Sequence, residues 1–263
     1  MMCVENARLQ DTERPMPRMI LLGTGTGLPD ADRGHTHMVW DGPGGPLLVD
    51  AGGCTYERLL RAGIDPQILS GVIITHSHCD HINGLPGLIF SMRLGGRQAS
   101  LPIYGLAPVL QVLERALEAM QVEYHVPVDW RPLEAGDTLE LAEGWQVRTA
   151  PTAHSRPGLA LRFEAPGRAL VYSADTEPCP AVRDLARGAT TLIHEATTAE
   201  PFSGHTTPRQ AGEVAAAAGA ARLVLVHYSP RWTMPEAAAL AAVAAGGFTG
   251  RAEIGRDGQV VEL

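Results

Sequence analysis

The stretch Thr75-His76-Ser77-His78-Cys79-Asp80-His81 places three imidazoles and one carboxylate close together in the chain. Structural zinc sites close around four ligands that are usually rich in cysteine. Histidine and aspartate instead suit a catalytic transition metal ion that keeps one coordination position open. The four side chains are also too many for one loop to arrange around a single tetrahedral ion. The stretch therefore predicts part of a catalytic metal centre, with His76, His78, Asp80 and His81 as ligands.

The composition is that of a globular protein. The chain has 263 residues, of which 45% are hydrophobic and 19% charged, so disorder is not indicated. The formal net charge of −8 argues against a broad basic surface for nucleic acid. The apolar runs are too short to span a membrane, and a cytoplasmic location without a membrane partner is expected. The four cysteines form no Cys-x-x-Cys pair, and Cys79 is expected to be a buried spectator.

Several short apolar runs of the β type end abruptly in a side chain with useful chemistry. Short continuous apolar runs are typical of strands that are buried on both faces. Side chains at the carboxyl ends of such strands would lie along one edge of a sheet packed between helices. The residues that follow or end these runs are Asp50, His76, Asp175, His194-Glu195 and His227.

Helices are predicted between these strands. Residues 55–62 closely follow Asp50, and residues 107–121 have apolar side chains at helical spacing. A capping threonine and a first-turn proline begin an Ala-rich helix over 207–218, and another proline begins a helix over 235–246. The strands and helices together predict an α/β (α+β) protein with two sheets between helix layers. Residues 1–17 are expected to form a flexible N-terminal tail, and residues 18–263 a single domain.

Three residues later in the chain complete a set of metal ligands. His154 follows the strand-like run 145–150, while Asp175 and His227 follow buried strands. A lone histidine or aspartate is usually structural, but together with the cluster these residues supply two full sets. One ion would take His76, His78 and His154, a second would take Asp80, His81 and His227, and Asp175 would bridge them. This inventory is typical of a two-metal hydrolase.

At this point the chain resembles the metallo-β-lactamase superfamily, and within it the ribonuclease Z branch, over essentially residues 19–263. Residues 22–27 (Leu-Gly-Thr-Gly-Thr-Gly) are similar to the family's first strand and loop, residues 48–52 to its first motif and residues 76–81 to its second. The resemblance implies the four-layer αββα sandwich, two divalent ions and a homodimer. Zn²⁺ is the first choice, although Mn²⁺ or Fe²⁺ would also suit these donors. Asp50 is expected to orient a ligand histidine rather than bind metal.

Two further motifs narrow the resemblance to the ribonuclease Z branch. Residues 194–197 (His-Glu-Ala-Thr) are similar to its HEAT motif, and residues 205–207 (His-Thr-Thr) to its HST motif. The resemblance implies that Glu195 and His205 work as a pair beside the metals. A histidine held by a glutamate is a suitable proton donor for the alkoxide that leaves when a phosphodiester is broken.

The resemblance implies a dinuclear-metal-dependent phosphodiesterase. A metal-activated hydroxide would attack phosphorus in line, with Asp80 orienting or deprotonating it. His205, supported by Glu195, would then protonate the leaving oxygen. An RNA substrate would yield a 3′-hydroxyl and a 5′-phosphate, and the family's reaction suggests precursor tRNA processed at its 3′ side.

The chain departs from the ribonuclease Z pattern between the third and fourth metal motifs. Enzymes of that branch carry a protruding tRNA-binding arm there, whereas only the twenty residues 155–174 separate His154 from Asp175, enough for a hairpin around 165–168. Basic residues near the motifs that could meet phosphates are Arg93, Arg97, Arg156 and Arg231. The departure puts the tRNA substrate in question but leaves the chemistry unchanged.

Two other classes of function are compatible with parts of the pattern. A small-substrate hydrolase of the same fold, acting on a small or cyclic phosphodiester, an aryl sulfate or a lactone, would use the same metals. A non-catalytic metal-binding interaction protein would be expected to lack a ligand, and none is missing from the two sets. His35 and His37, on an early loop, are given a solvated or structural role in preference to one in the site.

Overall fold

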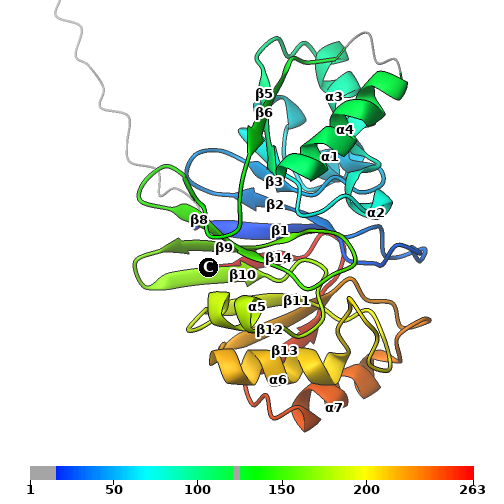
Figure 1. The fold of residues 1–263 in the computed structure, drawn as a ribbon, viewed down its shortest axis with the longest axis vertical. Coiled ribbons are helices and arrows are strands. Elements are labelled where there is room, and N and C mark those ends of the chain that lie inside the picture. The colour runs from blue at the N-terminus through cyan, green and yellow to red at the C-terminus, as the bar shows by residue number, and fades with distance from the viewer. Residues whose placement is uncertain (1–15, 121–124) are drawn as a thin grey trace, which may run out of the picture.

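The strands of the molecule form two sheets that face one another (Figure 1). The computed structural model describes residues 16–120 and 125–263, so the predicted tail lies outside the described residues except for 16 and 17. The first sheet has the order β14 (Val260–Glu262), β1 (Arg18–Gly23), β2 (His37–Asp41), β3 (Leu47–Val49), β4 (Gly71–Ile73), β5 (Leu101–Gly105) and β6 (Val128–Pro132). The second has the order β13 (Arg251–Ile254), β12 (Arg222–Val226), β11 (Thr191–Glu195), β10 (Arg168–Tyr172), β9 (Leu159–Ala165), β8 (Gln146–Pro151) and β7 (Thr138–Glu140).

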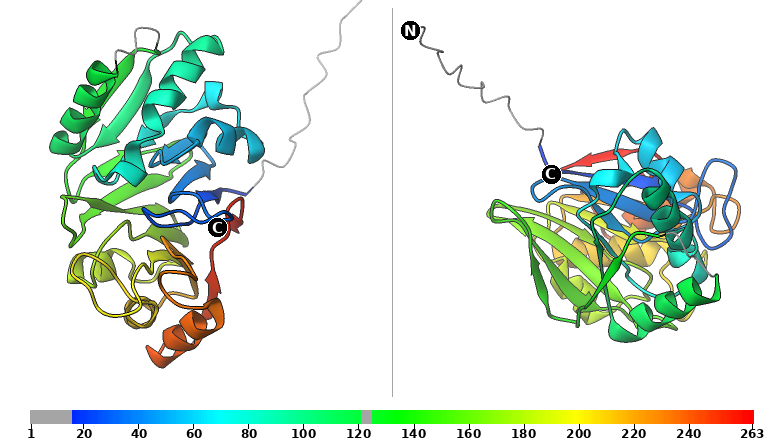
Figure 2. Two further views of the ribbon diagram at one scale, coloured as in Figure 1. Left: turned by 90° about the vertical axis from the view of Figure 1, so that its right-hand side faces the viewer. Right: turned by 90° about the horizontal axis from the view of Figure 1, so that it is seen from above.

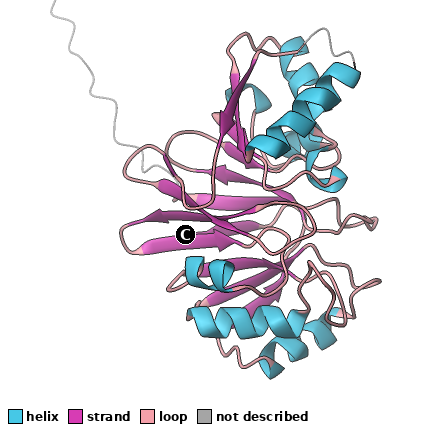
Figure 3. Ribbon diagram, in the orientation of Figure 1, coloured by secondary structure: helices cyan, strands magenta, loops and turns pink. Residues whose placement is uncertain are grey.

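Helices cover the outer face of each sheet (Figures 2 and 3). On the first sheet lie α1 (Thr55–Arg61), α3 (Leu85–Leu94) and α4 (Ala107–Ala119), with the short helices η1 (Pro66–Ile68) and α2 (Cys79–Ile82) in the connections. On the second lie α5 (Pro180–Leu185), α6 (Pro208–Ala218) and α7 (Glu236–Ala245). This arrangement confirms the predicted four-layer αββα sandwich. No helix in the described part of the chain is both long and apolar enough to cross a bilayer.

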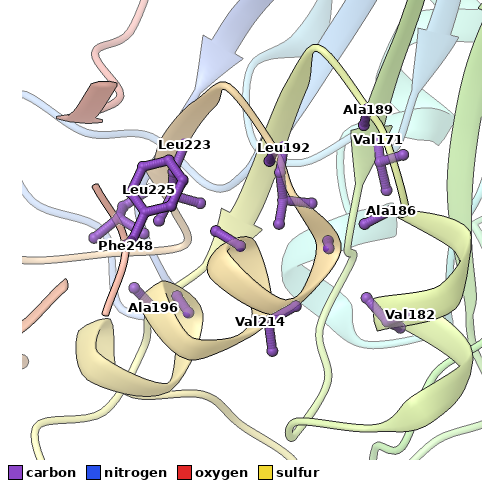
Figure 4. Packing of buried hydrophobic residues seen from close by; sticks show 14 of the residues in the cluster. Val171, Val182, Ala186, Ala189, Leu192, Ala196, Val214, Leu223, Leu225 and Phe248 are labelled. Atoms are coloured by element: carbon purple, nitrogen blue, oxygen red, sulfur yellow. The ribbon is translucent and has the colours of Figure 1, made fainter. Parts of the chain in front are cut away.

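Three hydrophobic clusters fill the spaces between the four layers. One packs α1, α3 and α4 against the first sheet, a second lies between the two sheets, and a third packs the second sheet against α5, α6 and α7. Figure 4 shows part of the third, where Leu192, Leu223 and Leu225 face Val182 and Val214. Burial on both faces explains why central strands such as β3 and β12 contain continuous apolar runs.

Alternation along single strands divides the apolar residues between these clusters. In β1, Met19 and Leu21 point to the space between the sheets, while Ile20 and Leu22 point to the helices. In β12 the same rule sends Val224 inward and Leu223 outward. These two strands are therefore tied to both neighbouring layers, and a shift of one residue would exchange their two faces.

Parallel pairing brings the carboxyl ends of the central strands to one edge of the sandwich. In the first sheet β3, β4, β5 and β6 pair in parallel, and in the second β10, β11, β12 and β13 do so. The segments that follow β4, β10, β11 and β12 lie toward the right-hand side of Figure 1. The predicted hairpin around 165–168 is the turn between β9 and β10, which pair antiparallel up to Ala165 and Arg168.

Helix α6 shows how local sequence fixes an element beside this edge. Thr207 caps it in a capping box with Gln210, and the left-handed Gly219 follows its last turn. Its buried face is tightly packed against α7 at Gly212. A Cβ atom built on Gly212 would lie 2.3 Å from the carbonyl oxygen of Val243, which leaves no room for a side chain.

We expect Gly212→Ala to destabilise the protein by about 1–3 kcal/mol, because the added methyl group must push α7 away. The higher helix propensity of alanine offsets only about 1 kcal/mol of this. Gly87 in α3 is the matched control, because nothing lies within 4 Å of a Cβ atom built there. Gly87→Ala should be neutral or slightly stabilising. Urea unfolding at one fixed metal concentration measures both, and a Gly212→Ala protein as stable as the Gly87→Ala protein would refute the packing argument.

Candidate metal centre

The edge formed by the carboxyl ends of the parallel strands collects the predicted ligands from both sheets. From the first sheet come the residues after β4 and those of the short helix α2, and from the second the residues after β8, β10 and β12. The side chains brought together are His76, His78, Asp80, His81, His154, Asp175 and His227. Their donor atoms fall into groups whose members lie within 4.8 Å of one another.

Three strand ends carry residues with left-handed backbone. Asp50 after β3 has a φ of 60°, Ala174 after β10 a φ of 51° and His227 after β12 a φ of 48°. Such values are uncommon outside glycine and recur at functional sites, where the surrounding structure holds them. The turns redirect the chain so that the side chains at the strand ends face the gap between the two sheets.

The first group consists of His76, His78, His154 and Asp175. His78 Nδ1 lies 3.2 Å from His76 Nε2 and 2.9 Å from His154 Nε2. Two nitrogens bound to one zinc ion at ordinary bond lengths and tetrahedral angles are separated by about 3.3 Å. The three imidazoles therefore already face one another at nearly the spacing of ligands of one ion.

The second group consists of Asp80, His81 and His227, with Asp175 between the two groups. His227 Nε2 lies 3.2 Å from Asp80 Oδ2 and 3.3 Å from Asp175 Oδ2. His81 Nε2 lies 3.5 Å from each of the same two oxygens. His76 Nε2, from the first group, lies 3.8 Å from Asp175 Oδ2. Asp175 thus stands within reach of both groups, as a bridging carboxylate must.

The residues present fit divalent metal ions. His81 Nε2 and Asp175 Oδ1 are buried and have no hydrogen-bond partner among the described residues. Unpaired buried polar atoms are costly, and a cation between them would satisfy both. Imidazole and carboxylate donors suit zinc, manganese or iron. The arrangement is therefore a divalent metal site.

Contacts on the far side of each ring orient the histidines. His81 Nδ1 lies 2.8 Å from Asp50 Oδ2, and His154 Nδ1 donates to the Gly204 carbonyl oxygen at 2.6 Å. His227 Nδ1 lies 2.7 Å from the Thr197 hydroxyl. Such outer contacts fix the tautomer that presents the other nitrogen to a metal. The contact of Asp50 agrees with the orienting role expected from the sequence. Thr197 is the last residue of the motif 194–197 and Gly204 directly precedes His205, but neither was expected from the sequence to contact a ligand histidine.

The electrostatic environment keeps the carboxylates charged. Burial alone would raise the pKa of Asp80, but the hydrogen bond from His227 and the charge of His81 hold it far below its ordinary value. Burial opposes ionisation of Asp175 too, yet the charges of His227 and His81 lower its pKa well below the usual range. Both side chains are consequently in the state that binds a cation.

The pKa values of His76 and His78 are shifted in the opposite direction from that of His81. Burial, followed by the charge of His81, lowers the pKa of His76 well below its ordinary value. Burial, followed by the charge of His154, lowers that of His78. For His81, burial is outweighed by Asp175 and Asp50, which raise the pKa well above its ordinary value. A metal ion bound at His81 Nε2 would take the place of the proton on that nitrogen, while Nδ1 would keep its proton and donate it to Asp50.

Glu195 and His205 form a hydrogen-bonded pair beside these groups. His205 Nδ1 lies 3.0 Å from Glu195 Oε1, and Glu195 is completely buried at the end of β11. Burial lowers the pKa of His205, but the hydrogen bond and charge of Glu195 overcome it and raise the pKa. The His205 ring stacks on that of His227 with centroids 5.7 Å apart and lies edge-on to that of His154 at 4.9 Å, so it borders both groups.

Some expectations about neighbouring residues are wrong. Cys79 is exposed rather than buried, because its side chain lies on the outer side of the first turn of α2. Arg97 donates to the carbonyl oxygens of Gln67 and Leu69 and therefore stabilises a connection away from the site. His37 begins β2 and does not lie on a loop, but its burial agrees with the structural alternative of its expected role.

The sequence of the chain is similar to one protein family and to proteins named ribonuclease Z. Residues 47–228 match the family described as "Beta-lactamase superfamily domain". The ribonuclease Z of Methanothermobacter thermautotrophicus is 32% identical, over 84% of this chain and 89% of that protein. The ribonuclease Z of Mycobacterium bovis is 30% identical, over 94% of this chain and 99% of that protein.

Solved structures show the same fold at lower identity. The metallo-beta-lactamase fold protein YhfI from Bacillus subtilis has a TM-score of 0.80 and 23% identity, over 95% of this chain and 100% of that one. The short form of human tRNase Z has a TM-score of 0.73 and 24% identity, over 93% of this chain and 98% of that one. A diphosphatase from the PhnP family has a TM-score of 0.75 and 22% identity, over 94% and 98%.

We expect Asp50→Asn to weaken Zn²⁺ binding about 10–100-fold. An amide cannot accept hydrogen bonds from both Thr75 and His81, as the Asp50 carboxylate does through its two oxygens. Titration calorimetry of Zn²⁺ into the metal-free protein measures the effect. Asp41→Asn is the control, because it removes a partly exposed ion pair with Arg18 and should leave Zn²⁺ affinity unchanged. Equal affinities for the two variants would contradict the orienting role of Asp50.

Proposed function

From the membership of the chain in the beta-lactamase superfamily, and within it in the ribonuclease Z-like metal-dependent phosphodiesterases, we propose a specific reaction. The protein processes precursor tRNA at the 3′ side and uses two zinc ions. The observation that carries the choice of chemistry is the hydrogen bond between Glu195 and His205 beside a complete set of His and Asp donors. A metal hydrolase that expels an alkoxide needs a proton donor in this position.

In the proposed centre, seven residues hold the two ions. One ion is held by His76, His78 and His154, the other by Asp80, His81 and His227, with Asp175 between them. The mutual distances of the donor atoms and the buried, unpaired atoms of His81 and Asp175 support this assignment. When bound, the ions would supply a nucleophile from water at neutral pH and stabilise the charge that develops on the phosphoryl oxygens.

Asp80 orients the attacking water in the proposed reaction. Its Oδ2 atom is engaged by His227 and faces His81, so the second oxygen remains for a hydrogen bond from water. The low pKa of Asp80 means that the carboxylate holds a proton poorly. It is therefore assigned the orientation of the water, and not the storage of its proton.

His205 donates the proton to the leaving oxygen. Glu195 accepts from Nδ1, which leaves Nε2 as the atom that faces a substrate. The raised pKa of His205 favours the protonated ring, which can give its proton to the leaving oxygen. The side chain is only 20% exposed, so the proton is transferred within a largely enclosed site.

The tRNA substrate is supported by the relatives at 30% identity and above, which are named ribonuclease Z and match over almost their whole length. Arg156 and Arg231 are exposed in the loops after β8 and β12, the strands that His154 and His227 follow, and we assign them to substrate phosphates. The same proposal includes a cytoplasmic location and, from the sequence resemblance, a homodimer. Light scattering of the purified protein decides the oligomeric state.

A second candidate is hydrolysis of a small phosphodiester. The segment between His154 and Asp175 contains only β9, β10 and their tight turn, both strands of which belong to the second sheet. No arm projects from this segment to bind a tRNA body. The structural neighbour described as a diphosphatase has a similar overall fold. The site would then act on a substrate small enough to bind through the residues of the metal centre alone.

We expect the zinc-loaded protein to cleave a precursor tRNA carrying a 3′ trailer, leaving a 3′-hydroxyl and a 5′-phosphate. His205→Ala should lower kcat about 10²–10⁴-fold, because the leaving oxygen loses its proton donor. Asp80→Ala should cripple turnover as well. His125→Ala is the control, since that ring faces the neighbouring Val126 carbonyl oxygen and belongs to none of the groups of metal donors found among the described residues, and it should cleave at the wild-type rate.

Product analysis on denaturing gels separates the alternatives. Hydrolysis of bis(p-nitrophenyl) phosphate without cleavage of the precursor would replace the tRNA proposal by the small-substrate candidate. Near-normal cleavage of the precursor by His205→Ala would remove the proposed role of the Glu195–His205 pair.

A further inference from the structure

Thr197 connects the metal groups to the Glu195–His205 pair. It lies just after β11, where the main chain is fixed by a hydrogen bond from the Thr233 hydroxyl to the Thr197 carbonyl oxygen. Its own hydroxyl lies 2.7 Å from His227 Nδ1 and 2.6 Å from Glu195 Oε2. One side chain thus touches both a candidate metal ligand and the carboxylate that holds the candidate acid.

The positions of the protons decide which atom donates in each of these hydrogen bonds. A neutral imidazole that binds metal through Nε2 carries its proton on Nδ1, so His227 must donate to Thr197. The hydroxyl has one proton of its own. Its possible acceptors are Glu195 Oε2 at 2.6 Å and the His227 carbonyl oxygen at 3.1 Å. The carboxylate is the nearer and stronger acceptor, so the proton goes to Glu195.

Glu195 is surrounded by donors. Oε1 accepts from the main-chain N–H of Thr176 at 2.9 Å and faces His205 Nδ1 at 3.0 Å. Oε2 accepts from the N–H and the hydroxyl of Thr197 at 3.1 and 2.6 Å. The carboxylate is buried, and each of its oxygens is held by two contacts. The orientation of His205 consequently depends on a group that Thr197 helps to fix.

We propose that Thr197 is a positioning residue whose hydroxyl sets the tautomer of His227 for metal binding and, through Glu195, holds His205 in place for proton donation. The claim about His227 depends on the metal site alone and is the metal-binding half of the inference. The claim about His205 is the second half and rests on the proposed function. The resulting chain runs from His227 Nδ1–H to the Thr197 hydroxyl and on to Glu195, which also accepts from His205.

Replacement by valine keeps the shape of Thr197 and removes the hydroxyl. His227 Nδ1–H would lose its acceptor and Glu195 Oε2 one of its two donors. Loss of an outer contact of this kind typically weakens metal binding 10–100-fold. Serine retains the hydroxyl and should restore both contacts. Thr198 provides a matched control, because it is also partly buried but its hydroxyl has no partner among the described residues.

The test compares Thr197→Val, Thr197→Ser and Thr198→Val with the wild-type protein. Titration calorimetry of Zn²⁺ into each metal-free protein gives the affinities, and thermal unfolding of the metal-free proteins shows whether each variant is folded. At saturating Zn²⁺, kcat is measured on bis(p-nitrophenyl) phosphate, whose leaving group hardly needs a proton, and on precursor tRNA, whose alkoxide does.

We expect Thr197→Val to bind one Zn²⁺ at least tenfold more weakly and to lose at least tenfold more kcat on precursor tRNA than on the p-nitrophenyl ester. Thr197→Ser should restore both properties, and Thr198→Val should alter neither. Zn²⁺ affinity of Thr197→Val within threefold of wild type, a loss that serine does not restore, or an equal loss in Thr198→Val would overturn the metal-binding half.

Equal losses of kcat on the two substrates would overturn the coupling to His205. If wild-type protein cleaves neither substrate, the proposed function fails and takes this second half with it. The Zn²⁺ affinities still decide the first half, so the two failures are distinguishable.

Discussion

Convergence of three imidazole nitrogens on one buried carboxylate oxygen, Asp175 Oδ2, is the constraint on which the site depends. The Nε2 atoms of His76, His81 and His227 lie 3.8, 3.5 and 3.3 Å from it. The first two residues follow β4 and the third follows β12, so the contact joins the two sheets at their shared edge. A cation between these groups would tie the halves of the sandwich together, which makes metal binding and folding parts of one equilibrium.

The precision of the centre comes from groups that need never touch a metal. Asp50, Thr197 and the Gly204 carbonyl oxygen each engage the far nitrogen of one histidine. Thr197 and Gly204 lie in the segment after β11, which also carries His205. This segment therefore orients both the candidate metal ligands and the proton donor. Residues that hold the reacting groups within a fraction of an ångström have this double duty in many active sites.

The sequence predicted the sandwich and the ligands because both leave local signals. Runs such as 223–226 show two-sided burial directly, and the motif 76–81 places four candidate ligands in one short segment. Contacts between segments that are far apart in the chain leave no such local signal in the sequence. The Gly204 carbonyl oxygen reaches His154 through the backbone, which any residue possesses, and the exposure of Cys79 depends on the direction of α2. Arg97 resembled a phosphate ligand by position alone, whereas its donors are used by backbone carbonyl oxygens.

Anomalous diffraction at the zinc absorption edge, from crystals of the zinc-loaded protein, tests the central claim most directly. The account predicts two peaks, one among His76, His78 and His154 and one among Asp80, His81 and His227, with Asp175 in contact with both. A single peak, or peaks that lie away from these side chains, would contradict it.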